Sequence, residues 1–317
     1  MPPLISILVP AYNAEKWLAD TLTSAVSQTW PRKEIIVVDD GSSDATLSIA
    51  RGFESSVIKV LADDHRGKAA AVNLAVEVSQ GDYIQYLDAD DILAADKIAI
   101  QVERLRSQPA NSVATCTWTR FYNDDLRTAI FRHQPDYRDY ERPIDWLLQQ
   151  YDGHATMPPL AWLLPRAVVE IIGPWNPSLT LNDDTEYFTR AVLNSDRILF
   201  CEAARGYYRS GNTTLSGLRN RSALESFYTV CELCTQHVVS FENSARTRQA
   251  CANLWQHFAH WVYPEAPDLI RCAENKARSF GGARLKLKGG AAFKIAQQLI
   301  GWKAARRLQQ ARTWSRN

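Results

Sequence analysis

The stretch GDYIQYLDADDIL, residues 81–93, runs from a strand-like apolar segment directly into Asp88, Asp90 and Asp91. Carboxylates this close repel one another, and acidic side chains are rarely buried without a compensating charge. Gly81 marks the end of a preceding helical segment. We therefore expect a strand here, followed by an acidic turn that has a positively charged partner.

Around this stretch, the first 120 residues alternate short β-rich segments with segments of helical periodicity. Apolar residues recur at three- and four-residue spacing in the helical segments. Strands that alternate with crossover helices predict an α/β fold with a mostly parallel sheet, whose ligands lie at the carboxyl ends of the strands. The predicted strands are 4–9, 34–39, 57–62, 83–88 and 112–118, and the predicted helices are 14–28, 44–53, 67–78 and 95–107.

Polar segments follow four of the predicted strands. Residues of this kind are common in turns, so one such segment would indicate turn chemistry alone. Four of them at one edge of one sheet favour a ligand site. The segments are AYN at 11–13, DDGSSD at 39–44, DDHRGK at 63–68 and DADD at 88–91.

Composition limits the class of protein. The chain has 317 residues, of which 46% are hydrophobic and 22% charged, as is typical of a soluble globular protein with one large α/β unit and a smaller region. No apolar segment reaches the roughly 20 residues that span a bilayer. The N-terminal segment lacks the basic region and cleavage site of a signal peptide, so a cytoplasmic location is expected.

The cysteines and histidines do not indicate a metal cage. Cys231 and Cys234 have the spacing of a redox motif, but they lie in a helical pattern with no second pair that would complete a zinc site. We expect the six cysteines to be reduced, buried thiols. The six histidines show no ligand-like clustering.

The C-terminal segment differs in charge from the rest of the chain. Residues 275–317 carry eleven Lys or Arg and no acid, although the whole chain has a net charge of only +1. Helical patterns cover 220–240, 245–262 and 290–312, and the last has an apolar stripe at Phe293, Ile300, Ala304 and Leu308. Peripheral contact with the inner face of a membrane is one reading, and a solvated helix is the other. Nucleic acid is not expected as a partner, because no recognition helix or aromatic RNA motif accompanies the basic segment.

Four segments in the same order resemble family 2 glycosyltransferases, which have the GT-A fold of nucleotide-diphospho-sugar transferases. They are SILVPAYNAEKWLADTLTSAVSQTW, EIIVVDDGSSDAT, RGKAAAVNLAV and GDYIQYLDADDIL. The resemblance is dense over residues 4–105 and returns at 160–193, which makes it more specific than a single motif. It implies a GT-A catalytic domain at 1–218, with a nucleotide-sugar half at 1–110 and an acceptor half at 111–218. A helical, basic C-terminal region follows at 219–317.

The resemblance implies a role for the acidic turn. In such enzymes a DxD motif, here Asp88 and Asp90, holds a divalent cation, Mn²⁺ or Mg²⁺, on the donor diphosphate. These cations prefer carboxylate and phosphate oxygens. Asp90 is the expected direct ligand, Asp88 is expected on the ribose or the metal, and Asp91 is a candidate helix cap.

The same family pattern suggests the donor pocket. Pro10, Ala11 and Tyr12 would flank the base, Asp40 would accept a hydrogen bond from the imide N–H of uracil, and Lys68 would lie near the phosphates. A UDP-sugar is therefore favoured, although dTDP offers the same imide edge and some relatives use GDP. The alternatives are that Asp40 is a turn acid, Tyr12 a core aromatic residue and Lys68 a solvated residue at a helix start.

The segment NDDTEYFTR, residues 182–190, resembles the family's catalytic motif. There, the Asp six residues before the Arg is the general base, so Arg190 indicates Asp184. Asp183, expected on the acceptor side, replaces the commoner Glu. A base at this place would take the proton of the acceptor hydroxyl and give inversion. The alternative, that both acids cap the following helix, is compatible with catalysis.

Three further residues complete the expected site. Arg209 lies in YYRSGNTTLSG, residues 207–217, which resembles a flexible basic loop that approaches the diphosphate. His154 and Trp162, in HATMPPLAWLL at 154–164, are expected to contact the acceptor. Core packing is the alternative for the aromatic residues.

The resulting prediction is an inverting, metal-dependent glycosyltransferase of surface polysaccharide biosynthesis. It would move a monosaccharide from a nucleotide-diphosphate sugar to a hydroxyl of a glycan or lipid-linked acceptor. One alternative is a nucleotidyltransferase, although residues 10–17, PAYNAEKW, lack the glycine-rich phosphate loop of that class. The other is an inactive sugar-nucleotide-binding scaffold, which fold alone cannot exclude.

Overall fold

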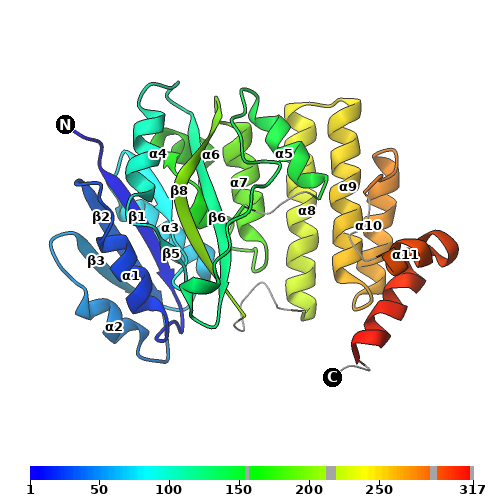
Figure 1. Ribbon diagram of the computed structural model, residues 1–317, viewed down its shortest axis with the longest axis horizontal. Coiled ribbons are helices and arrows are strands. Elements are labelled where there is room, and N and C mark those ends of the chain that lie inside the picture. Colours follow the sequence, from blue (N-terminus) through cyan, green and yellow to red (C-terminus); the bar gives the residue numbers. More distant parts are fainter. Residues whose placement is uncertain (154–156, 212–218, 286–290, 315–317) are drawn as a thin grey trace.

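The computed structural model describes residues 1–153, 157–211, 219–285 and 291–314. Its main sheet has the strand order β3-β2-β1-β4-β7, and all but the last strand run parallel (Figure 1). The predicted α/β fold with a mostly parallel sheet is therefore confirmed. The strands are β1 (Ile5–Ala11), β2 (Lys33–Asp40), β3 (Ile58–Asp63), β4 (Tyr83–Tyr86) and the antiparallel β7 (Leu164–Pro165).

Four helices lie between the strands of the first 120 residues. The central strands β1 and β2 are buried almost throughout, as expected where helices cover both faces of a parallel sheet. The first helix begins at Leu18 rather than at residue 14, because residues 15–17 form a turn. The helices are α1 (Leu18–Val26), α2 (Thr46–Gly52), α3 (Lys68–Val78) and α4 (Lys97–Leu105).

A second sheet lies beside the first. Its order is β5-β8-β6, with β6 parallel and β5 antiparallel to β8. The predicted strand at 112–118 belongs to this sheet, because its partner β8 comes about 80 residues later in the chain, where periodicity cannot assign it. The strands are β5 (Ile92–Leu93), β6 (Val113–Tyr122) and β8 (Ile198–Ser210).

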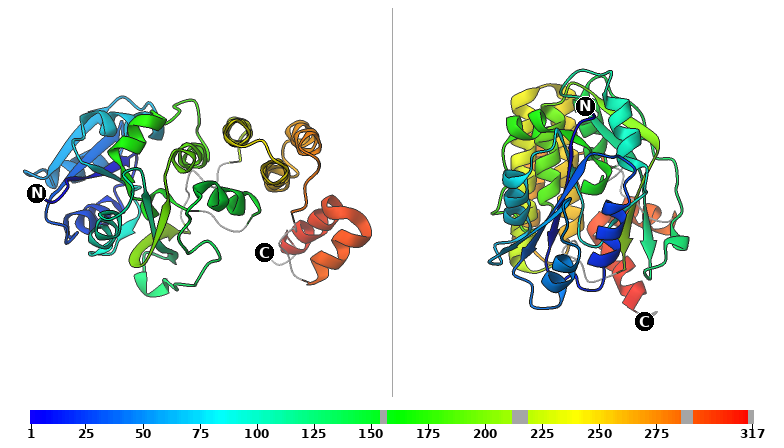
Figure 2. Two further views of the ribbon diagram at one scale, coloured as in Figure 1. Left: turned by 90° about the horizontal axis from the view of Figure 1, so that it is seen from above. Right: turned by 90° about the vertical axis from the view of Figure 1, so that its left-hand side faces the viewer.

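The second half of the chain is mainly helical. Figures 1 and 2 show α8, α9 and α10 side by side beyond α7, with α11 at the end of the molecule opposite the parallel sheet. No helix in the described ranges combines the length and apolar character that crossing a membrane requires. The elements are η1 (Leu126–Thr128), α5 (Pro143–Tyr151), η2 (Pro159–Ala161), α6 (Arg166–Ile172), α7 (Asp183–Leu193), α8 (Arg221–Phe241), α9 (Ala245–Val262), α10 (Pro267–Ser279) and α11 (Ala291–Trp314).

Two details of this half differ from the expectations. Helices α5, α6 and α10 were not predicted, although Pro143 and Pro267 in the first turns of α5 and α10 are typical start signals. The six cysteines are free thiols as expected, but Cys272 is exposed while the other five are buried. One hydrophobic core runs from the main sheet into α8, α9 and α10, so these helices share the packing of the sheet.

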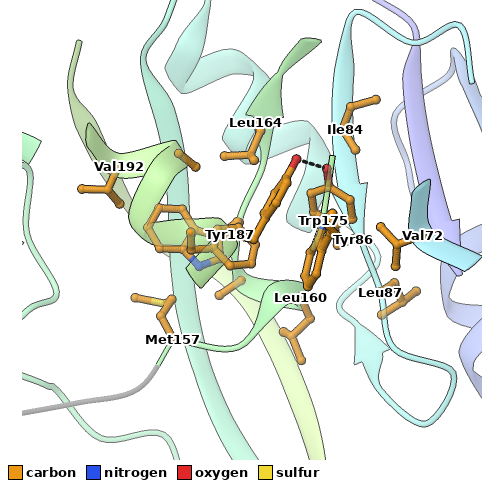
Figure 3. Packing of buried hydrophobic residues seen from close by; sticks show 14 of the residues in the cluster. Val72, Ile84, Tyr86, Leu87, Met157, Leu160, Leu164, Trp175, Tyr187 and Val192 are labelled. Carbon is orange, nitrogen blue, oxygen red and sulfur yellow. Dashed lines mark hydrogen bonds between the residues drawn. The ribbon is translucent and has the colours of Figure 1, made fainter. Parts of the chain in front are cut away.

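A buried aromatic cluster joins the end of β4 to α7 (Figure 3). The hydroxyl groups of Tyr86 and Tyr187 are hydrogen-bonded at 2.6 Å, and Trp175 stacks on Tyr187 with ring centroids 4.4 Å apart. Tyr86 lies two residues before Asp88, and Tyr187 lies three residues after Asp184. The cluster therefore fixes the acidic turn after β4 relative to the acids at the start of α7.

Candidate functional site

A cavity of about 540 Å³ opens where β1, β2 and β4 end and α7 begins. It is at the carboxyl edge of the parallel strands, where the sequence predicts a ligand site. Nine of the predicted site residues, drawn from both halves of the chain, line it together. They are Pro10, Ala11, Tyr12, Asp40, Lys68, Asp88, Asp90, Asp183 and Asp184.

The positive partner that the acidic turn requires is Lys68. Its Nζ lies 2.6 Å from Oδ1 of Asp88, with both side chains mostly buried. Burial alone would lower the pKa of Lys68, but the carboxylates of Asp88, Asp183 and Asp184 raise it above its ordinary value. Lys68 therefore carries a permanent charge between the two pairs of acids.

One ammonium group does not balance these carboxylates. Burial and the neighbouring Asp88 raise the pKa of Asp90 to about 6. Burial and Asp183 raise the pKa of Asp184 to about 6, and burial also raises the pKa of Asp183. Carboxyl groups with raised pKa values are short of positive charge, so the cavity is suited to a ligand that brings a cation.

The residues present fit a divalent cation that is shared with a substrate. In the part of the chain that the structure describes, no three His, Cys, Asp or Glu side chains are grouped around one point where a metal could sit. Mg²⁺ is usually held by one or two carboxylates together with substrate phosphates. Asp88 and Asp90 offer such a pair of oxygen ligands on one turn.

Asp40 organises the rim of the cavity. It is only 2% exposed, and its carboxylate accepts the backbone N–H groups of Arg66 at 2.7 Å and Gly67 at 2.9 Å. Gly41 allows this close approach, because its φ is +69° and a Cβ atom there would lie 2.8 Å from the amide nitrogen of His65. Asp40 thus has the structural role of a turn acid. Oδ2 of Asp40 also lies 3.2 Å from Nδ1 of His65, while Oδ1 keeps a second lone pair that can accept a ligand N–H.

An aromatic pair at this rim was not predicted. His65 stacks on Tyr12 with ring centroids 4.1 Å apart, and both residues line the cavity. Tyr12 is 47% exposed and is therefore not a core residue. The sequence singled out the segment 63–68, but no spacing rule connects His65 with Tyr12.

The acids of α7 lie in the first turn of the helix. Asp184 Oδ1 accepts the N–H of Thr185 at 2.8 Å, and the positive end of the helix dipole favours carboxylates there. Arg190, four residues after Glu186, donates to its carboxylate at 2.7 Å and to the carbonyl of Pro174 at 2.9 Å. Arg190 therefore fixes the helix to the preceding segment and does not enter the cavity.

Helix α8 supports this part of the site. Ser226 of α8 accepts the backbone N–H groups of Thr180 and Leu181 at 2.8 and 3.1 Å. His237 of α8 contacts the carboxylate of Glu186 at 3.1 Å. The segment that leads into Asp183 and Asp184 is therefore held by residues far away in the sequence, which no local pattern could indicate.

Two of the expected roles do not match the structure. Trp162 is fully buried and stacks on Phe188 with centroids 4.9 Å apart, so neither face is open to an acceptor. Asp91 is not a helix cap, because α4 begins only at Lys97 and the Asp91 carboxylate accepts the backbone N–H of Arg209. His154, the other expected acceptor contact, lies outside the described residues.

The expected approach of Arg209 to the diphosphate does not match the structure either. It lies in β8 with 1% of its side chain exposed, and it does not line the cavity. Its guanidinium group packs behind the acidic turn instead of approaching a ligand in front of it.

The side of the cavity next to α7 is largely apolar. Its lining includes Pro159, Pro177, Leu179 and Leu181, beside Asp183 and Asp184. Pro159 lies in the segment that the sequence assigned to the acceptor. The other three are unremarkable in the sequence and become part of the site only through the loop that Ser226 holds.

Comparison with known proteins places the chain among glycosyltransferases. The sequence model of glycosyl transferase family 2 matches residues 6–168. The chain is 38% identical over 103 residues to the Escherichia coli protein named UDP-Glc:alpha-D-GlcNAc-diphosphoundecaprenol beta-1,3-glucosyltransferase WfgD, which covers 32% of this chain. That match spans 41% of the relative, and matches to several other curated relatives span 41% to 56% of their length.

Two solved structures share the fold. S. aureus TarS 1-349 in complex with UDP-GlcNAc superposes with a TM-score of 0.74 at 18% identity, over 97% of this chain and 91% of that one. The mannosyltransferase PcManGT from Pyrobaculum calidifontis, in complex with GDP-Man and Mn²⁺, gives a TM-score of 0.56 at 20% identity, over 99% and 83%. At these identities the likeness concerns the fold alone, and it agrees with the predicted GT-A architecture.

The raised pKa of Asp184 predicts how stability depends on pH. Since this pKa is about 6 in the folded protein against 3.8 for an unperturbed group, the folded state binds more protons than the unfolded state between these values. The free energy of unfolding should therefore fall as the pH rises from about 4 to 6 and stay low above that. In metal-free protein at pH 7, Asp184→Asn should increase the free energy of unfolding by about 1–2 kcal/mol. The full pKa shift corresponds to ~3 kcal/mol, and the expected gain is smaller because the side chain of Asp184 is partly exposed.

Urea unfolding at pH 5 and pH 7 measures this effect. The matched control is Asp64→Asn, an exposed acid outside the cavity, for which a change within about 0.5 kcal/mol is expected. If Asp184→Asn had a lower free energy of unfolding than the wild-type chain at pH 7, the charge of Asp184 would not be unfavourable to the fold, which would contradict the prediction.

Proposed function

Since the chain belongs to glycosyl transferase family 2, we propose that it is an inverting, metal-dependent glycosyltransferase that moves a monosaccharide from a nucleotide-diphosphate sugar to a hydroxyl group. The observation that carries the proposal is the grouping of two acid pairs around Lys68 in one cavity. One pair follows β4, and the other begins α7. The proposal assigns one pair to the donor and the other to the acceptor, so that the two substrates would meet in the same cavity.

On the donor side, Asp88 and Asp90 would hold Mn²⁺ or Mg²⁺ against the diphosphate. The bound cation would act as a Lewis acid that offsets the charge of the departing nucleotide. Lys68 would then leave Asp88 and pair with a phosphate oxygen, since the cation would replace Lys68 as the counter-ion of Asp88. The nucleobase of the donor would lie at the rim, between Tyr12 and the carboxylate of Asp40. UDP is the favoured nucleotide because Asp40 can accept an imide N–H there.

On the acceptor side, Asp184 would be the general base. A carboxyl group with a pKa of about 6 is mostly ionised at pH 7, yet it is more basic than an ordinary Asp. It would remove the proton of the acceptor hydroxyl as that oxygen attacks the anomeric carbon opposite the nucleotide, which inverts the configuration. Asp183 would bind the acceptor beside it.

The acceptor we propose is a glycan or a lipid-linked sugar. The apolar residues Pro159, Leu179 and Leu181 next to the base suit a partly apolar molecule. The E. coli relative is named for an acceptor on diphosphoundecaprenol, which supports a lipid-linked acceptor here. A nucleotidyltransferase would have no use for a base at Asp184, and an inactive sugar-nucleotide-binding scaffold would have no need of the second acid pair at Asp183 and Asp184.

We further propose that α11 contacts an anionic membrane surface. Ile295, Leu299 and Ile300 are 58%, 79% and 50% exposed, and residues 275–317 around them carry eleven basic residues and no acid. Basic residues attract anionic lipid, while exposed apolar side chains insert at the interface. Trp302 does not take part, because it packs inward against His260 and Tyr263.

Membrane contact by α11 predicts selective binding to anionic vesicles. Flotation with vesicles of phosphatidylglycerol and phosphatidylcholine should recover the protein, and phosphatidylcholine alone should not. The double variant Ile295→Ser/Leu299→Ser should reduce recovery about fivefold. Ile171→Ser removes an equally exposed apolar residue on α6 and serves as the control. Equal recovery of the double variant and the control would contradict membrane contact through α11.

The proposed reaction predicts that nucleotide binding depends on the metal. UDP should raise the melting temperature only when Mn²⁺ is present, because the diphosphate otherwise meets uncompensated carboxylates. Asp90→Ala should abolish this increase. Asp184→Asn should retain it while lowering sugar transfer by at least about 10³-fold, because it keeps the donor site and removes the base.

A screen of UDP-, dTDP- and GDP-sugars with Mn²⁺, read by nucleotide release, identifies the donor. Asp64→Asn again provides the control, with both stabilisation and transfer unchanged. Full transfer by Asp184→Asn would refute the assignment of the base, and stabilisation by UDP without metal would refute the shared cation.

A further inference from the structure

Arg209 lies directly behind the acidic turn. Its backbone N–H donates to Oδ1 of Asp91 at 2.9 Å, and its Nε donates to the carbonyl oxygen of Asp90 at 2.7 Å. The turn is closed by the N–H of Asp91, which donates to the carbonyl of Asp88 at 3.0 Å. Two donors of Arg209 therefore hold two consecutive residues of the turn.

The contact to Asp90 is specific to its main chain. Asp90 lines the cavity, and its carbonyl oxygen accepts the Nε–H of Arg209. Arg209 itself does not line the cavity and is 1% exposed. Arg209 thus fixes the peptide group from which the Asp90 carboxylate extends, without touching what the cavity binds.

The guanidinium group is itself fixed by three other elements. Its Nη1 donates to Asp124 at 2.7 Å, its Nη2 donates to Asp20 at 3.3 Å, and it packs on the ring of Phe121 at 4.6 Å. Asp124 also pairs with Lys16 at 2.9 Å. Asp20 comes from α1, Phe121 from β6 and Asp124 from the turn that follows β6.

This geometry requires an arginine. A planar guanidinium can donate in three directions at once and still pack flat against an aromatic ring. A lysine ammonium is a single point that cannot reach the carbonyl of Asp90 and both carboxylates together. The buried charge is compensated by partners that are partly exposed, with Asp124 at 36% and Asp20 at 64%.

We propose that Arg209 is a positioning residue that sets the Asp90 carboxylate in place for the divalent cation and the diphosphate. This inference rests on the proposed function, because it assigns Arg209 a role in the same donor site. It replaces direct contact with the diphosphate, which the burial of Arg209 does not permit.

The test compares Arg209→Lys and Arg209→Met with the wild-type chain in the presence of UDP. Free Mn²⁺ is followed by electron paramagnetic resonance, which reads metal binding independently of activity. Both variants should weaken Mn²⁺ binding by at least about tenfold, as is usual when a partner of a metal ligand is lost. At saturating Mn²⁺, kcat should return to within about threefold of wild type, because Arg209 touches no reacting atom.

Arg205→Met is the matched control, since Arg205 is an exposed arginine of the same strand whose side chain packs on Phe131, away from the turn. It should bind Mn²⁺ as the wild type does. A merely structural Arg209 would lower the melting temperature and leave Mn²⁺ affinity unchanged, and that result would overturn the inference.

A second variant keeps the test decisive if the Arg209 variants do not fold. Asp20→Asn/Asp124→Asn loosens the guanidinium group while retaining Arg209, and should weaken Mn²⁺ binding about threefold. Unchanged affinity in this double variant would overturn the inference. Failure of the proposed function looks different, because the wild-type chain itself would then bind no Mn²⁺ with UDP or any other nucleotide diphosphate.

Discussion

The structure of the site depends on the crowding of carboxylates around Lys68. Asp88, Asp90, Asp183 and Asp184 share one cavity with this ammonium group, and burial with mutual repulsion raises the pKa of Asp90 and Asp184 to about 6. Such an arrangement stores unfavourable electrostatic free energy in the ligand-free state. In the function proposed above, a cation and a diphosphate would release this free energy, so that the crowding of acids would favour binding of the donor.

Crowding is useful only if the acids cannot move apart. The hydrogen bond between Tyr86 and Tyr187 spans the two halves of the cavity through the core. Ser226 of α8 holds the loop before Asp183, and Arg209 holds the turn that carries Asp90. Helix α8 therefore helps to position the acids, although none of its residues is among the described residues that line the cavity.

The local sequence pattern was sufficient to predict the parallel strands β1 to β4, but not the contacts between segments that are distant in the sequence. Periodicity and turn residues located β1 to β4 and the acids at their ends, because crossover connections force the carboxyl ends of parallel strands together. The sequence could not pair 113–122 with β8, stack Tyr12 on His65 or bury Trp162 against Phe188, since each depends on partners 26 or more residues away. Arg209 was expected to approach a diphosphate from a flexible loop, whereas it lies in β8 and holds the acidic turn from behind, a contact between residues more than 100 positions apart.

The most direct measurement is an anomalous difference map from crystals grown with UDP and Mn²⁺. A shared cation predicts one manganese peak about 2.0–2.6 Å from a carboxylate oxygen of Asp90 and from a diphosphate oxygen, with Lys68 displaced from Asp88. UDP bound in the cavity without a manganese peak, and with Lys68 still paired to Asp88, would contradict the cation as the partner of the crowded acids.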